Sequence, residues 1–133
     1  LDTLETALPW SKVLDVNAKA CKAIATSLTK INEKVHVFSH LSHLYPDGAS
    51  MYITFAWRHA QDPEATLARW QLMKTAASEI ITQAGGTISH QHGVGHDHKP
   101  WLVVEKGKLG IQAIQSAVKT FDPKGIFNTG NLV

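Results

Sequence analysis

Histidines dominate the residues of this chain that could carry chemistry, and they fall into two groups of four. One group is spread over residues 36–59 and the other over residues 90–98; the members are His36, His40, His43 and His59, then His90, His92, His96 and His98. Imidazole titrates near neutral pH and is a common metal ligand, so each group could move a proton or hold a cation. No His-Glu-x-x-His is present to indicate a zinc hydrolase. We expect His36, His59, His96 and His98 to be ordinary solvated residues.

The segment Ser89–Gly95 is the most suggestive part of the second group. His90 and His92 bracket Gln91, and side chains at i and i+2 of an extended segment point the same way. Gly93 and Gly95 follow at once, and glycine lets the backbone approach a ligand closely, although an ordinary tight turn would also explain them. The two imidazoles would line one side of a site with hydrogen-bond donors. Such a site could bind an anionic group or transfer a proton.

Tyr52 is the other candidate. It lies in a segment, Ser50–Arg58, whose residues alternate as in a β-strand, with Met51, Ile53, Phe55 and Trp57 on one face. Tyr52 therefore projects from the opposite face. Its phenol could act as an acid or base if His40 or His92 lies beside it; the alternative is a structural tyrosine that packs its ring and anchors its hydroxyl.

Residue patterns predict the elements that must position these groups. A short strand over 1–8 leads into a helix that begins near Pro9 and Ser11 and closes at Asn32. Strands Val35–Leu44 and Ser50–Arg58 flank the turn Tyr45-Pro46-Asp47-Gly48. Asp62-Pro63-Glu64 starts a second helix that Gly85-Gly86 ends. The remaining expectations are a strand at Thr87–Ser89, a helical turn at Pro100–Lys106, a helix at Lys108–Phe121 that buries Ile111, Ile114, Val118 and Phe121, and a tail packed through Ile126 and Phe127.

This order of elements predicts a single α+β domain over residues 1–133, with a ferredoxin-like antiparallel sheet, helices on one face, and additional C-terminal helices. Such a sheet leaves the Tyr52 face open, and a second layer or a ligand must cover it. A missing partner domain is the economical explanation.

Composition narrows the classes of function. The chain is 44% hydrophobic and 18% charged with a net charge of +2, which is ordinary for a globular protein. It has no basic block for nucleic acid and no apolar run long enough to span a bilayer. The single Cys21 excludes an internal disulfide, is expected to be a packed thiol, and fits a cytoplasmic setting. The first residues do not resemble a signal peptide, so we expect the chain to begin inside a longer protein.

The stretch from Gly85 to Gly95, with Lys99-Pro100-Trp101-Leu102 and the ending Phe121-Asp-Pro-Lys-Gly-Ile-Phe-Asn-Thr-Gly-Asn-Leu132, resembles the C-terminal end of FAD-linked oxidases of the vanillyl-alcohol-oxidase type. Within that group the chain is most similar to the alkylglycerone-phosphate (alkyldihydroxyacetone-phosphate) synthases and their bacterial relatives. The resemblance runs from about Trp10 to the end.

The resemblance implies a substrate-binding cap domain of an FAD-dependent oxidoreductase or synthase, acting on a small hydroxylated or phosphorylated molecule at the flavin. It implies that FAD is held mainly by an N-terminal domain of the same polypeptide, which is absent here, so this chain alone would be inactive. The family's histidine loop maps onto His90, Gln91 and His92, with Gln91 a departure from three histidines, and its active-site tyrosine maps onto Tyr52. The implied contacts with the cofactor come from Gly93, Val94, Gly95 and Asn128.

Three alternatives remain open. A sister branch, the FAD-dependent D-2-hydroxy-acid dehydrogenases, binds a divalent metal, but Gln91 replaces the glutamate that such a site uses and Asp47-Gly48 is not followed by that branch's Asn-x-His. No metal ligand is therefore assigned. A second alternative is a self-standing histidine-rich binding module. A third is a homodimer that pairs its open sheet faces.

Overall fold

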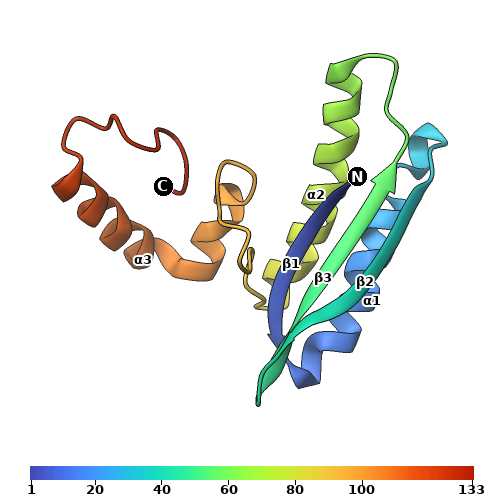
Figure 1. Cartoon of the computed structure of the whole chain (residues 1–133), viewed down its shortest axis with the longest axis horizontal. Coiled ribbons are helices and arrows are strands. Elements are labelled where there is room, and N and C mark those ends of the chain that lie inside the picture. The colour runs from blue at the N-terminus through green and yellow to red at the C-terminus, as the bar shows by residue number, and fades with distance from the viewer.

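The computed structural model describes residues 1–133 as a sheet with two helices and a separate C-terminal arm (Figure 1). The elements in chain order are β1 (Asp2–Pro9), α1 (Trp10–Thr26), a 3-10 turn (Thr29–Ile31), β2 (Val35–Leu44), β3 (Gly48–Trp57), α2 (Pro63–Gln83) and α3 (Lys99–Phe121). The expected mixture of an antiparallel sheet and helices is confirmed. None of the helices combines the length and apolar content that crossing a bilayer requires.

The sheet is antiparallel with strand order β1-β3-β2. Its register places Tyr52 on β3 opposite both Glu5 on β1 and His40 on β2. The pairing of β2 with β3 shifts between Leu41 and His43, so Ser42 is the extra residue of a β-bulge. A bulge re-aims the side chains beside it, and this one lies next to the residues that gather on the open face.

The strand predicted at Thr87–Ser89 is not a regular strand, yet this segment runs along the free edge of β1. The backbone nitrogen of Thr87 donates to Ala7 O at 3.4 Å, and that of His90 donates to Glu5 O at 3.0 Å. The next backbone N–H, that of Ile88, donates to the side chain of Glu105 at 2.8 Å. The segment nevertheless lies where the fourth strand of a ferredoxin-like sheet belongs.

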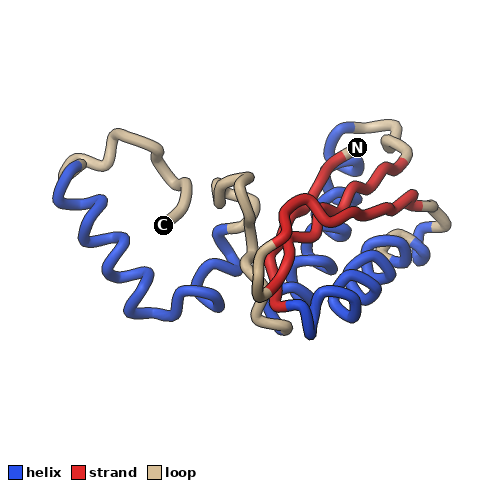
Figure 2. The backbone as a smooth tube through the Cα atoms, turned by 60° about the horizontal axis from the view of Figure 1, so that its bottom comes forward, coloured by secondary structure: helices blue, strands red, loops and turns tan.

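The helices α1 and α2 lie on the same side of the sheet, as Figure 2 shows. The hydrophobic core between them and the sheet contains Leu4, Leu8, Val13, Val16, Ala20, Ile24, Leu28, Ala49, Met51, Ile53, Phe55, Met73 and Ala77. Removing this surface from water is the main favourable term in folding. The predicted assignment of Met51, Ile53 and Phe55 to the buried face is confirmed, and Cys21 packs against the same core.

The predicted helix starts are more accurate than the predicted ends. Asp62 caps α2 through a bond from Ala65 N to its Oδ1 at 2.7 Å, and Pro63 is the first helical residue. The first helix, however, ends at Thr26 rather than at Asn32. The hydroxyl of Ser27 donates to Ile24 O at 2.7 Å, and such local side-chain bonds offer the backbone an alternative to the helix. Asn32, at φ 55°, closes the 3-10 turn instead.

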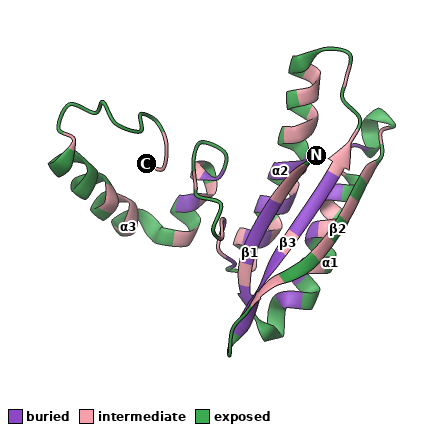
Figure 3. Ribbon diagram, viewed as in Figure 1, coloured by how far each residue is buried: buried purple, intermediate pink, exposed green.

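The predicted burial of the C-terminal helix is wrong. The turn at 100–106 and the helix at 108–121 both form, joined through Gly107 at φ 68°, but Leu102 is the one buried residue of α3. Phe121 is 87% exposed and Phe127 is 72% exposed, Val118 and Ile126 are also exposed, and Ile111 and Ile114 are only partly covered. The cause is geometric, because beyond Gly107 the arm leads away from the sheet (Figures 1 and 3).

The close approach of the β2–β3 turn to the end of β1 gives a test of this packing. A Cβ at Gly48 would overlap the backbone carbonyl of Leu8, which cannot move without breaking the β1–β3 ladder. We expect Gly48→Ala to lower the free energy of unfolding by about 2–4 kcal/mol in urea denaturation. The neighbouring change Asp47→Ala removes an exposed side chain, and a loss as large as that of Gly48→Ala would contradict this explanation.

Candidate active site

A buried glutamate that the sequence analysis did not single out organises the histidine loop. The side chain of Glu5 is only 3% exposed. Its Oε1 accepts a hydrogen bond from the hydroxyl of Ser42 and lies 3.1 Å from His90 Nδ1 and 3.5 Å from His43 Nδ1. Its Oε2 lies 3.2 Å from His92 Nε2. A buried carboxylate needs such partners to offset its lost hydration.

Three separate elements bring these partners together. Glu5 comes from β1, and the bulge of β2 turns Ser42 and His43 toward it. The loop after α2 supplies His90 and His92, which flank Gln91 as predicted and direct their ring nitrogens at the same carboxylate. The segment is not extended as expected, because Gln91 adopts φ 60° and the chain turns between the two histidines. The predicted convergence of the loop histidines is therefore seen, although the group they converge on was missed.

Tyr52 lies in this cluster, as predicted. Its ring stacks on His40 with centroids 5.2 Å apart and meets the ring of His92 edge-on, also at 5.2 Å. Its hydroxyl donates to Thr3 Oγ1 at 3.4 Å, which is a long contact. The structure thus places Tyr52 beside two imidazole rings without a hydrogen bond to either, and an acid–base role for Tyr52 stays a prediction.

Tyr45 is the tyrosine that bonds to the loop. Its hydroxyl lies 2.9 Å from His90 Nε2. The sequence analysis treated Tyr45 only as part of a turn. The turn itself is fixed, because Tyr45 N donates to Gly48 O at 2.8 Å and the indole of Trp10 donates to Tyr45 O at 3.1 Å.

The hydrogen bonds of Glu5 decide its charge. Burial alone would raise the pKa of this carboxyl, but the bonds from Ser42 and His90 outweigh burial and bring the pKa below its ordinary value. Glu5 is therefore an anion at neutral pH. The cluster is a buried negative charge surrounded by imidazole rings.

His98 corrects an expectation, because it is buried at 7% exposure rather than solvated, whereas His36, His59 and His96 are exposed as expected. His98 N donates to Val94 O at 3.1 Å and its Nδ1 lies 3.1 Å from Gly93 O, so the loop folds over the ring. Burial lowers the pKa of His98 more than the bond to Gly93 raises it. The ring is thus a neutral support of the loop.

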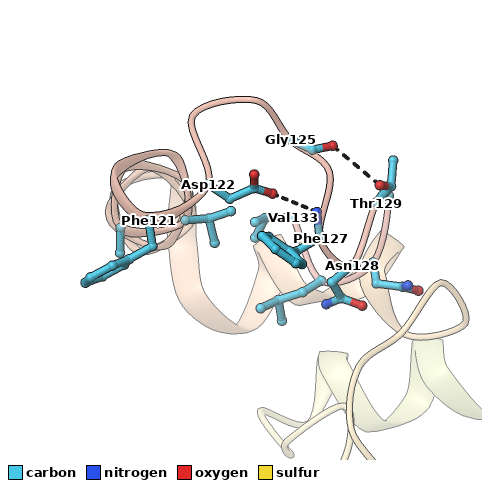
Figure 4. A pocket seen from close by; sticks show the side chains of 12 residues that line it. Phe121, Asp122, Gly125, Phe127, Asn128, Thr129 and Val133 are labelled. Carbon is cyan, nitrogen blue, oxygen red and sulfur yellow. Dashed lines mark hydrogen bonds between the residues drawn. The ribbon is translucent and has the colours of Figure 1, made fainter.

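The residues predicted to contact a cofactor lie in two places. Gly93 and Gly95 have φ of 75° and 56°, and nothing lies within 4 Å of where a Cβ would be, so this backbone is open to a ligand; Val94 between them is partly buried. Asn128 instead lines a cavity of about 690 Å³ in the C-terminal arm, with Phe121 and other residues of the last 17 (Figure 4). The tail that carries Asn128 meets the loop where Leu132 N lies 3.5 Å from Gly95 O.

Three of these side chains could also hold a cation. One ligand atom from each of Glu5, His43 and His90 lies within 4.8 Å of the other two. An imidazole and carboxylate set of this kind suits zinc or manganese. The same contacts are explained equally well by hydrogen bonds to a buried carboxylate.

Comparison with known proteins matches residues 1–132 to the family described as "FAD linked oxidases, C-terminal domain". The chain belongs to this family. This FAD-linked oxidase domain is 31% identical over 134 residues to an alkyldihydroxyacetonephosphate synthase of Caenorhabditis elegans, which covers 99% of the domain and 22% of the synthase. It is 28% identical over 133 residues to an uncharacterised FAD-linked oxidoreductase, YgcU, of Escherichia coli strain K12, covering 98% and 27% of the two chains.

A solved structure of an alkyldihydroxyacetonephosphate synthase has the same fold as this FAD-linked oxidase domain. The TM-score is 0.63 at 22% identity, over 97% of the domain and 20% of the synthase. The domain thus spans about a fifth of the length of the synthases it matches.

The charge of Glu5 predicts how stability depends on pH. A carboxyl whose pKa is lowered on folding contributes stability above its unfolded pKa, near 4.5, and that contribution is lost as the pH falls through the folded pKa. We expect Glu5→Gln to lower the free energy of unfolding by about 1–3 kcal/mol at neutral pH. The difference between wild type and variant should shrink as the pH falls below 4.5, where the unfolded carboxyl takes up its proton first, and should be smallest below the folded pKa, where both proteins carry a neutral group.

Chemical denaturation of both proteins across this pH range measures that difference. Asp2 and Glu105 also have lowered pKa values, so the wild type alone would not isolate Glu5. A difference that stays constant or grows toward acid pH would show that Glu5 is not an anion in the folded state.

Proposed function

We propose that this chain is the substrate-binding cap of an FAD-dependent oxidoreductase or synthase that acts on a small hydroxylated or phosphorylated substrate. The observation that carries the proposal is the convergence of His90, His92 and Tyr52 around the ionised Glu5 on the sheet face that no helix covers. Membership in the family of FAD-linked oxidases and the synthase names of its relatives support the same class of reaction.

The proposed roles follow from what each group can do. Glu5 accepts a hydrogen bond from the ring of His90 and keeps its second oxygen 3.2 Å from His92 Nε2, so the carboxylate lies between the two rings. With side chains 16% and 27% exposed, these rings border the solvent and could bind a hydroxyl or phosphate oxygen or take up a proton. Tyr52 lies edge-on to His92 and would line the site on the β3 side.

The backbone at Gly93–Gly95 fits the approach of a flat ring system. Both glycines adopt left-handed torsions and present no side chain, and nothing lies within 4 Å of the position that a Cβ would take at either of them. FAD, when bound, supplies an acceptor for a hydride or for a covalent adduct at the flavin ring. In the proposal Gly93, Val94 and Gly95 lie against that ring, and the contact predicted for Asn128 stays a prediction.

An N-terminal FAD-binding domain of the same polypeptide is the proposed partner. The supporting observation is the C-terminal arm, whose Leu109, Phe121 and Phe127 are 72% or more exposed in this chain. Apolar surface of this kind marks an interaction site. The chain also spans only about a fifth of the relatives it matches, which leaves ample length for a flavin-binding domain in them.

The full-length reading frame provides the test. We expect the complete protein to purify with bound FAD, and the isolated 133-residue chain to show no stoichiometric FAD binding in equilibrium dialysis. In the complete protein, His92→Asn should slow flavin reduction by about 100-fold, followed by flavin absorbance with panels of dihydroxyacetone-phosphate esters and 2-hydroxy acids. His59→Asn, an exposed histidine outside the cluster, is the control. A complete protein without flavin, or equal effects of the two substitutions, would contradict the proposal.

A metal-dependent dehydrogenase is the second candidate function. The observation that favours it is the group Glu5, His43 and His90, whose ligand atoms are close enough to share one ion. Such an ion would polarise the oxygen of a hydroxy acid.

Metal analysis separates the two candidates. We expect the purified chain, after dialysis against zinc and then manganese, to retain less than about 0.1 ion per chain, because hydrogen bonds already satisfy Glu5. Elemental analysis by mass spectrometry measures this. One ion per chain that disappears in His43→Gln would overturn the first proposal in favour of the dehydrogenase.

A further inference from the structure

We propose that Tyr45 is the acid–base hydroxyl of this site and that His90 and Glu5 activate it as a carboxylate–imidazole–phenol chain. Its use in catalysis rests on the function proposed above. The chain of contacts itself rests on three residues from three elements: Glu5 on β1, His90 in the loop after α2, and Tyr45 at the end of the β2 strand.

When the ring of His90 is neutral, the hydrogen bonds that link Glu5, His90 and Tyr45 run in one direction. An ionised carboxylate has no proton to give, so the contact of 3.1 Å between Glu5 Oε1 and His90 Nδ1 requires the proton on Nδ1. The neutral ring then carries a lone pair on Nε2, and Nε2 lies 2.9 Å from the hydroxyl of Tyr45. In this neutral form the phenol donates to the ring. This is the order of donors and acceptors that activates the serine hydroxyl of hydrolytic triads.

The exposure of the three residues increases in the order Glu5, His90, Tyr45. The side chain of Glu5 is 3% exposed, that of His90 is 16% exposed, and Tyr45 is 39% exposed. The carboxylate is thus shielded from water. Its electrostatic influence on the ring of His90 is stronger in this buried position than it would be in water. The hydroxyl at the other end lies at the surface, where a ligand can reach it.

Backbone hydrogen bonds hold both His90 and Tyr45 in place. His90 N donates to Glu5 O at 3.0 Å, so the backbone and the ring of His90 are tied to the same residue. Tyr45 is fixed by the turn, through its bond to Gly48, and by the indole of Trp10. The alignment of hydroxyl and ring is therefore set before any ligand arrives.

Tyr52, the only other tyrosine, lacks these features. Its hydroxyl bonds to Thr3 and not to an imidazole nitrogen, and its ring packs between His40 and His92. The hydroxyl of Tyr52 thus has only a neutral hydroxyl as its partner, whereas that of Tyr45 has an imidazole nitrogen. The reactivity of Tyr45 can therefore be compared with that of Tyr52 in the same protein.

Acetylation by N-acetylimidazole tests the proposal without flavin or substrate. A new bond forms between the phenol oxygen and the acetyl carbon, the acetyl–nitrogen bond breaks, the phenol proton passes to His90 Nε2, and the departing imidazole takes a proton from water. We expect Tyr45 to react about 10- to 100-fold faster in the wild-type chain than in Glu5→Gln or His90→Gln. The reaction is run with a chelator, and peptide mass spectrometry measures both tyrosines.

The reactivity of Tyr52 serves as the reference in every protein, because it should change less than about twofold if the fold is intact. His96→Gln, an exposed histidine of the same loop, should leave the acetylation rate of Tyr45 unchanged. Equal Tyr45 rates in wild type and His90→Gln would overturn the proposal, and so would a fall in His96→Gln as large as that in His90→Gln.

Nitrogen-15 NMR of the wild-type chain gives a second measurement that needs no variant. We expect neutral His90 to carry its proton on Nδ1; a proton on Nε2 would overturn the proposal. Neither measurement involves FAD, so either can fail while the complete protein binds flavin. Both measurements can also succeed if the complete protein does not bind flavin.

Discussion

The burial of one carboxylate constrains most of the open sheet face. An ionised glutamate that is 3% exposed is tolerated only when hydrogen bonds replace its lost water. Glu5 receives them from a bulged strand and from a loop that lies 85 residues further along the chain. The bulge at Ser42 and the left-handed turn at Gln91 each depart from regular structure at a position where they supply a partner to this group.

The same arrangement gives the two loop histidines different surroundings. His90 is held from both sides, between Glu5 and Tyr45, whereas His92 touches Glu5 through Nε2 and presents its ring to Tyr52. Two imidazoles in one short loop are thus not equivalent.

How far the sequence predicts this structure depends on the range of the forces involved. The start of α2 and the two faces of β3 were predicted correctly, because a cap, a proline and an alternating pattern act over a few residues. Glu5 was missed because an acidic residue in an eight-residue strand looks like an ordinary solvated position; its burial depends on residues 42 and 90, far away in sequence. The burial of Phe121 failed for the opposite reason. Its apolar periodicity is real, but this part of the arm leads away from the sheet and its two helices (Figure 1), and Phe121 is 87% exposed.

The short hairpin turn and the histidine loop have a shared mechanical consequence. Since Tyr45 is linked through His90 to the first strand, and the turn also bears on the end of that strand at Gly48, these pieces cannot shift independently. A molecule that displaces the turn of the β2–β3 hairpin would therefore also displace the histidine loop. A contact at the hairpin turn would thus be transmitted to the buried carboxylate of Glu5 without a hinge between them.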